Sequence, residues 1–103
     1  MRLQLEQEPM VDISELRKEL DSYFEIMKNF QTGDPRENLM HLSSFTARMS
    51  EARGVIIRNP GGKAEQDFRT KEIDPFISEC DRQFKIWSRL ITYAQFDWET
   101  SRG

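Results

Sequence analysis

The sequence is poor in the side chains that most enzymes and metal sites need. Its 103 residues include one cysteine, Cys80, and one histidine, His41. A single cysteine excludes an internal disulfide, and the scattered carboxylates lack the ligand spacing of zinc or calcium sites. No Cys–His or Ser–His pair of the kind used in nucleophilic catalysis is indicated. We therefore expect no catalytic residues, no metal ion and no cofactor, and a metabolic enzyme is only a distant third choice.

Long apolar runs are missing as well. Apolar residues make up 37% of the chain and charged residues 32%, against averages of about 45–50% and 25% in globular domains. No stretch approaches the roughly 18 apolar residues of a membrane-spanning helix, and the N-terminus lacks the apolar core of a secretory signal. We therefore expect a cytoplasmic protein without membrane contact. This composition is typical of helices with narrow apolar stripes and wide polar faces.

The longest stripe lies in the last thirty residues. Apolar side chains recur there at alternating intervals of four and three, the heptad period that keeps one face of a helix against a partner helix. Asp74-Pro75 provides an N-cap and a proline for the first turn. The pattern predicts one helix over 74–101, about 40 Å long at 1.5 Å per residue. The residues of this stripe are Ile73, Ile77, Cys80, Phe84, Trp87, Ile91, Ala94 and Trp98.

Two shorter stripes precede it and predict a helical hairpin. The first helix is expected to begin at Asp12 and to end at Gly33, a residue that tolerates a left-handed backbone. Asp34-Pro35 opens the second helix, which Asn59-Pro60-Gly61-Gly62 ends. So short a connection makes the two helices antiparallel. The stripes are Ile13, Leu16, Leu20, Tyr23, Met27 and Phe30 in the first helix, and Leu42, Phe45, Met49, Ala52 and Ile56 in the second.

The remaining segments are predicted to lack regular structure. Residues 1–11 form a flexible N-terminal arm, and the polar stretch at about 59–72, with Phe68 as its only large apolar residue, forms a mobile loop. The predicted fold class is all-α. Residues 12–103 form a single domain in which an antiparallel hairpin and a long C-terminal helix build a three-helix bundle or an oligomeric helical assembly.

The long helix carries more large apolar side chains than contact with a single neighbouring helix can bury. Aromatic residues on two sides of a helix indicate two neighbours, the hairpin on one side and a second subunit or target helix on the other. The sequence therefore favours a self-associating or partner-binding adaptor that contacts itself, as a homo-oligomer, or a helical protein. The predicted interface residues are Phe76, Trp87, Leu90, Tyr93, Phe96 and Trp98.

Basic residues gather in the middle of the chain. Six Lys or Arg and three Asp or Glu lie between Arg48 and Lys71, which gives this segment a charge of +3 in a protein of net charge −3. Such a patch attracts phosphates. A solvated helix face followed by a polar loop is the simpler explanation, and the acidic total argues against a dedicated nucleic-acid-binding protein. The candidate phosphate contacts are Arg48, Arg53, Arg58 and Lys63.

The arrangement over residues 45–103 also resembles a known family. It combines a helix, a glycine-containing loop and a long helix with a D-x-x-Φ-x-Φ-W pattern, in Ala47-Arg48-Met49, Asp81, Phe84, Ile86, Trp87 and Ser101-Arg102-Gly103. It resembles the small helical recombination-mediator proteins of T4-like phages, the UvsY-like family. The resemblance implies a ring-forming oligomer that binds single-stranded DNA and helps a recombinase displace the single-strand-binding protein. It also implies that the four candidate phosphate contacts touch the DNA backbone.

Overall fold

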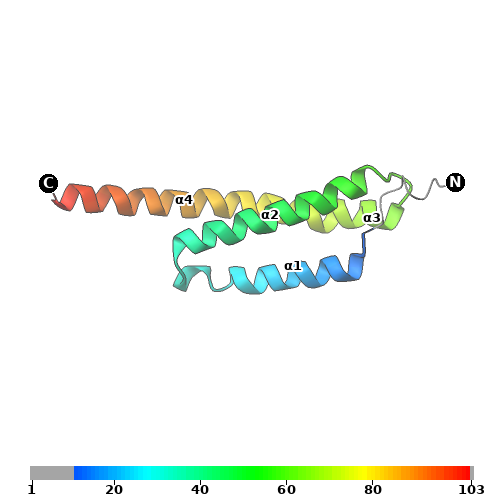
Figure 1. The fold of residues 1–103 in the computed structure, drawn as a ribbon, viewed down its shortest axis with the longest axis horizontal. Helices are drawn as coiled ribbons and strands as arrows, with labels where there is room; N and C mark the ends of the chain where they lie inside the picture. The colour runs from blue at the N-terminus through cyan, green and yellow to red at the C-terminus, as the bar shows by residue number, and fades with distance from the viewer. Residues whose placement is uncertain (1–10, 103) are drawn as a thin grey trace.

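Three long helices and one short helix make up the structure, a computed structural model that describes residues 11–102 and their side chains through Thr92. The long helices are α1 (Ile13–Met27), α2 (Pro35–Ile57) and α4 (Asp74–Arg102), and the short one is α3 (Lys63–Phe68). Helix α2 runs antiparallel to both α1 and α4 (Figure 1). No strand occurs in the described residues. The predicted all-α, three-helix fold is therefore confirmed, whereas nearly all of the predicted N-terminal arm lies outside the described residues.

Side-chain caps fix where the first two helices begin. The Asp12 carboxylate accepts a hydrogen bond from the Glu15 amide at 3.2 Å, and the Asp34 carboxylate accepts one from the Arg36 amide at 2.9 Å. Each bond satisfies a backbone N–H that has no partner inside the helix. Both predicted starts are confirmed.

The turn between α1 and α2 differs from the prediction. Helix α1 ends at Met27, six residues before Gly33, and a 3₁₀ turn at Phe30–Thr32 follows. Gly33 has extended backbone angles (φ −99°, ψ 179°), so the left-handed cap predicted there is wrong. The buried Asn38 side chain holds the turn by donating a hydrogen bond to the Phe30 carbonyl at 2.8 Å. A Cβ atom at Gly33 would lie only 3.3 Å from the Asn38 Oδ1 atom, which favours glycine in this close approach.

The core lies where the three long helices face one another. All five predicted stripe residues of α2 are buried, and the α1 stripe is buried or packed against the core. The Tyr23 ring stacks on Phe45 with ring centres 4.1 Å apart, which attaches α1 to α2 through aromatic contact. The buried apolar residues are Leu16, Leu20, Phe30, Leu42, Phe45, Met49, Ala52, Ile56, Phe68, Ile73, Phe76 and Cys80.

The predicted loop at about 59–72 is wrong for most of its length. After a short turn, α3 leads into a π-helical turn at Arg69–Ile73, which continues directly into α4. The Gln66 amide donates a hydrogen bond to the Ile56 carbonyl at the end of α2, 2.7 Å away, and Phe68 is buried. The segment is therefore helical and packed because one polar anchor and one aromatic ring attach it to the rest of the fold.

Helix α4 extends beyond the hairpin. Its Trp87 ring packs edge-on against Phe30 at the α1–α2 turn, with ring centres 6.1 Å apart. From there, the helix continues past the end of the hairpin and gives the molecule its long dimension of 70 Å (Figure 1). The predicted helix over 74–101 is confirmed. Within the described part of the chain, no helix has both the length and the apolar character needed to cross a membrane.

Candidate protein-interaction surface on α4

Phe76, a predicted interface residue, is part of the core. Only 2% of it is exposed. The rings of Tyr23, Phe24 and Phe45 lie around it, with centres 5.8, 5.2 and 6.4 Å away. The interface prediction is wrong for this residue because both α1 and α2 pack on α4. Two neighbours bury a wider face of a helix than the single line of a two-helix seam.

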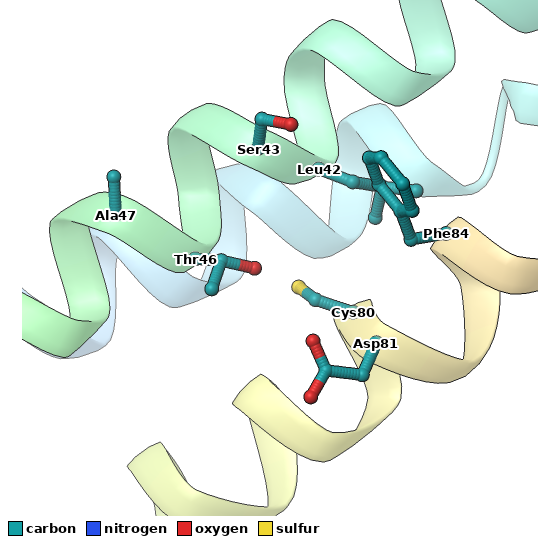
Figure 2. A pocket seen from close by; sticks show the side chains of 7 residues that line it. All are labelled: Leu42, Ser43, Thr46, Ala47, Cys80, Asp81 and Phe84. Atoms are coloured by element: carbon teal, nitrogen blue, oxygen red, sulfur yellow. The ribbon is translucent and has the colours of Figure 1, made fainter.

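Phe84 shows the opposite deviation. It lies on the predicted heptad line, yet 40% of it is exposed. Its ring stands at the edge of a groove of about 370 Å³ between α2 and α4 (Figure 2). Small side chains on α2 leave this space open. The lining residues are Leu42, Ser43, Thr46, Ala47, Cys80, Asp81 and Phe84.

Cys80 points into the same groove but offers no reactive group. The side chain is buried, and desolvation, opposed only in part by a hydrogen bond with Thr46, raises its pKa to about 11. At neutral pH the thiol is therefore protonated, whereas nucleophilic attack requires the thiolate. Cys80 acts as the small buried apolar residue that its heptad position predicts.

The exposed apolar side chains of α4 cluster where the helix passes the end of the hairpin. Leu90 is 46% exposed, Ile86 is also exposed, and the Trp87 ring is half-buried with its Nε1 atom donating a hydrogen bond to Gln83 Oε1 at 3.1 Å. A second groove, of about 540 Å³, is lined by Gln31, Arg82, Gln83, Ile86, Trp87 and Leu90. We call Phe84, Ile86, Trp87 and Leu90 the α4 patch. It contains two predicted interface residues, Trp87 and Leu90. Its other two members were not predicted to be in the interface, because Phe84 was assigned to the buried heptad line and Ile86 lies off that line.

The other three predicted interface residues continue along the same helix. Tyr93, Phe96 and Trp98 lie on the part of α4 whose backbone is helical, and their side chains lie outside the described residues. Their place in the interface stays a prediction.

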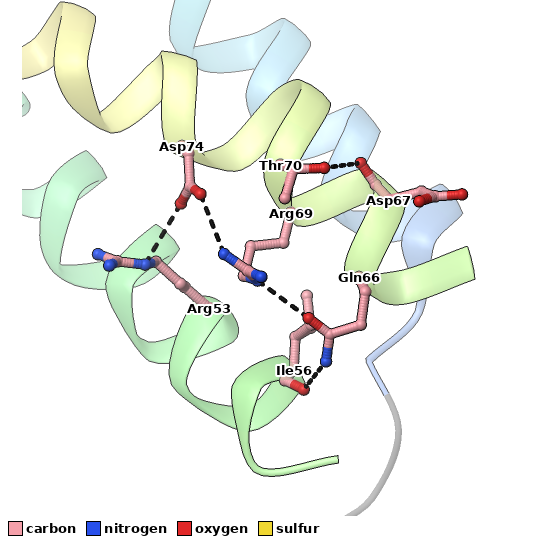
Figure 3. A network of polar contacts seen from close by, with 7 residues as sticks. All are labelled: Arg53, Ile56, Gln66, Asp67, Arg69, Thr70 and Asp74. Atoms are coloured by element: carbon pink, nitrogen blue, oxygen red, sulfur yellow. Dashed lines mark hydrogen bonds and ion pairs between the residues drawn. The ribbon is translucent and has the colours of Figure 1, made fainter. Parts of the chain in front are cut away.

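Arg48 and Arg53, both candidate phosphate contacts, form ion pairs with carboxylates of the same chain. Arg48 binds Glu19 of α1 through two hydrogen bonds of 2.7 and 2.9 Å. That pairing raises the pKa of Arg48 and lowers the pKa of Glu19. Arg53 lies 3.3 Å from the Asp74 carboxylate, which also accepts a hydrogen bond from Arg69 at 3.1 Å (Figure 3).

The remaining two candidates, Arg58 and Lys63, lie just after the end of α2 and at the start of α3. The Arg58 guanidinium lies over Gly54, where a Cβ atom would stand 3.3 Å from its Nη1 atom, and Lys63 is the exposed first residue of α3. The phosphate-binding role of all four residues stays a prediction. The carboxylates that pair with Arg48 and Arg53 were not identified in the sequence because local spacing does not connect Glu19 to Arg48, 29 residues apart.

His41 takes part in aromatic packing. Its ring lies between those of Phe30 and Phe45, with centres 6.3 and 5.8 Å away. In the described part of the chain, His, Cys, Asp and Glu side chains do not gather in groups of three or more that would hold a metal ion. The α4 patch is therefore the best-supported candidate for a functional surface.

Comparisons with known proteins add no relative. No protein-family model matches the chain, and no similar protein was found among curated proteins or solved structures. The resemblance to the UvsY-like mediators stays an untested prediction.

Proposed function

We propose that this protein is a non-enzymatic, self-associating helical adaptor or assembly protein whose contact surface is the α4 patch and the projecting part of α4. The observation that carries the proposal is the continuation of α4 as a helix beyond the hairpin (Figure 1). An isolated helix of about 12–15 residues is only marginally stable in water. A helix that projects with no neighbour among the described residues is expected to gain its stability from another molecule.

The side chains on this helix support the same proposal. Three large apolar residues of the patch are exposed where α4 leaves the hairpin: Phe84, Ile86 and Leu90. Exposed apolar side chains that cluster on one element, unlike ones scattered singly, mark interaction surfaces. In the sequence, the heptad stripe continues through Ile91, Ala94 and Trp98, so the apolar face extends along the projecting segment.

Light scattering or sedimentation over micromolar concentrations tests the proposal. We expect a concentration-dependent increase in mass, and we expect Leu90→Glu to weaken association at least about tenfold because it places a charge in the contact. Met40→Glu is the matched control, since Met40 is a large apolar residue that is 70% exposed and lies on α2 away from the α4 patch. A wild-type protein that stays monomeric at every concentration contradicts the proposal, as does equal weakening by both substitutions.

The alternative function is a phage-type recombination mediator that binds single-stranded DNA and loads a recombinase. Arg48 and Arg53 lend it no support, because carboxylates of the same chain engage both guanidinium groups. A titration with single-stranded DNA at two salt concentrations decides this question. Phosphate contacts make binding weaken with added salt, and a flat or absent response rules the alternative out.

A further inference from the structure

We infer that the α4 patch binds an acidic amphipathic helix of a partner protein, in the groove that Ile86 and Leu90 line. This inference goes beyond self-association and rests on one element of the proposed function, that the α4 patch is a contact surface. The groove, of about 540 Å³, lies between α4 and the α1–α2 turn, which contributes Gln31. Residues 26–33, which contain this turn, carry no carboxylate side chain.

Cationic side chains follow the α4 side of this groove. Arg82 lines it, and Lys85 and Arg89 follow at intervals of three and four residues, which places all three on one face of the helix. Ile86 lies four residues after Arg82 and three before Arg89, so the cations run beside the apolar side chains. From residue 82 to residue 96 the sequence contains no Asp or Glu. This segment therefore has a charge of +3 in a protein of net charge −3.

Little negative charge offsets these cations. Glu79 pairs with Arg82 through hydrogen bonds of 2.6 and 3.0 Å. In the part of the chain whose side chains are described, Lys85 and Arg89 form no side-chain hydrogen bond or ion pair, and both are exposed. Asp81 lines the other groove, between α2 and α4. An acidic partner therefore finds two uncompensated cations beside the apolar side chains of the patch.

The apolar side chains that line the groove favour a helical partner. Ile86, Trp87 and Leu90 lie within about one turn of α4, and Ile86 and Leu90 are exposed. Helices bind such grooves through apolar side chains of their own at intervals of three and four residues. The partner helix therefore combines an apolar stripe, which covers Ile86 and Leu90, with Asp or Glu along the side of that stripe that faces Arg82 and Arg89.

Two other ligands that cations attract fit this groove less well. An anionic membrane surface takes up an amphipathic helix that lies in its plane, whereas the α1–α2 turn stands beside the apolar side chains here. Single-stranded nucleic acid stacks its bases on exposed aromatic rings. The Trp87 ring is half-buried and packs against Phe30, and the exposed residues Ile86 and Leu90 are aliphatic. The observations therefore favour an acidic helix over both.

Fluorescence anisotropy of labelled synthetic peptides, titrated with the full chain, tests the charge of the partner. One peptide is a helix of about five turns with leucine at heptad positions a and d and glutamate at e and g, and the control peptide has lysine in place of glutamate. We expect the glutamate peptide to bind at least about tenfold more tightly, although the net charge of −3 favours the lysine peptide. Equal affinities, or tighter binding of the lysine peptide, overturn the inference.

Charge reversal tests the place of binding. Arg89→Glu is expected to weaken binding of the glutamate peptide at least about fivefold at about 0.1 M salt, where charges interact over about 10 Å. Lys63→Glu makes the same charge change on α3, at the opposite end of the molecule, and is expected to alter the affinity less than about twofold (Figure 1). Equal effects of the two substitutions overturn the assignment of the groove.

Salt separates the charged part of the contact from the apolar part. At about 1 M salt charges interact over only about 3 Å, so Arg89→Glu and the wild-type protein should bind the glutamate peptide alike. Ile86→Ala removes apolar contact, and its effect, about fivefold, should persist at both salt concentrations. Circular dichroism checks that each variant keeps the fold. An Ile86→Ala protein that binds as tightly as the wild type overturns the role given to the apolar side chains.

The same measurements distinguish this inference from the proposed function. Light scattering without peptide reports self-association alone. A protein that self-associates but does not prefer the glutamate peptide overturns this inference and leaves the proposed function intact. A protein that prefers the glutamate peptide but stays monomeric at every concentration contradicts only the proposed self-association. Tighter binding to phosphatidylserine vesicles, or to single-stranded DNA, than to the glutamate peptide overturns the choice of partner.

Discussion

The two halves of α4 carry the same heptad pattern in different surroundings. In the first half, Phe76 and Cys80 are each at most 2% exposed, because α1 and α2 pack on this half from two directions. In the second half, the helix passes the end of the hairpin and Leu90 is 46% exposed. The pattern therefore specifies which face of the helix is apolar, and the reach of the neighbouring helices decides how much of that face is buried.

The largest expected effect is on stability and distinguishes the two halves directly. Phe76→Ala removes a ring buried among three others and is expected to lower the free energy of unfolding by about 3–5 kcal/mol. Leu90→Ala, measured at a concentration where the protein is monomeric, is expected to cost less than about 1 kcal/mol because little packing is lost. Urea unfolding followed by circular dichroism gives both values. Similar losses would mean that the two halves are equally covered.

Thiol reactivity compares the same halves without altering the core. Burial raises the pKa of Cys80 to about 11, so its thiolate fraction at neutral pH is about 100-fold below that of a thiol with the ordinary pKa of 9.0. We expect Cys80 to react with a chromogenic disulfide at least about 100-fold more slowly than the thiol introduced by Thr92→Cys. Comparable rates for the two thiols would show that the first half opens readily.

The anchor of the segment before α4 is expected to contribute less. Gln66→Ala leaves the Ile56 carbonyl without its 2.7 Å hydrogen bond, which is expected to lower the free energy of unfolding by about 1 kcal/mol. Lys63→Ala, in the same short helix and exposed, is the control and is expected to have almost no effect. If the two substitutions lower the free energy of unfolding equally, the Gln66 hydrogen bond does not hold the first half of α4 in place.

The smallest expected effect is pH-dependent. The hydrogen bonds from Arg48 lower the pKa of Glu19 below its value in the unfolded chain. The pair therefore stabilises the fold above the unfolded pKa of Glu19, and this contribution is lost as pH falls through the lower, folded pKa. Because both side chains are about one-third exposed or more, Glu19→Gln should lower stability at pH 7 by only about 0.5 kcal/mol. The difference from wild type should vanish in acid.

The control for this pair is Glu25→Gln on the same helix. Glu25 pairs with Lys28 three residues away, and both side chains are 70% exposed. A pair so exposed to water should contribute less to the free energy of unfolding than the Glu19–Arg48 pair, which joins two helices. A larger pH effect at Glu25 than at Glu19 would contradict the importance given to the Glu19–Arg48 pair.

Local signals predicted much of the fold. The Asp12 and Asp34 caps and the stripe from Leu42 to Ile56 appear in the structure as the sequence indicates, because each depends on residues within one or two helical turns. Phe76 and Phe84 were assigned to the wrong surroundings because the burial of Phe76 depends on the placement of α1 and the exposure of Phe84 depends on the small side chains of α2, and both helices lie far away in the sequence.

The helical segment after Gly62 was not predicted because its residues are polar and two glycines precede it. One signal was present in the spacing of Phe68 and Ile73. Ile73 lies five positions after Phe68. In an α-helix this spacing places two side chains on different faces, whereas in a π-helix it places them about one turn apart. The candidate surface was predicted only in part, through Trp87 and Leu90. The apolar residues of α4 that stay exposed depend on where the hairpin ends, and local sequence patterns do not specify that position.

The π-helical turn at Arg69–Ile73 sets the phase between α3 and α4. Each residue of an α-helix rotates the chain by about 100°. Removing Thr70 would let the segment from Lys63 onward form one continuous α-helix. The residues of α3 would then be rotated about the helix axis by that angle relative to α4. Phe68 would then leave the core, and Gln66 would no longer face the end of α2. The one additional residue in the π-helical turn therefore allows both α3 and α4 to pack against the same hairpin.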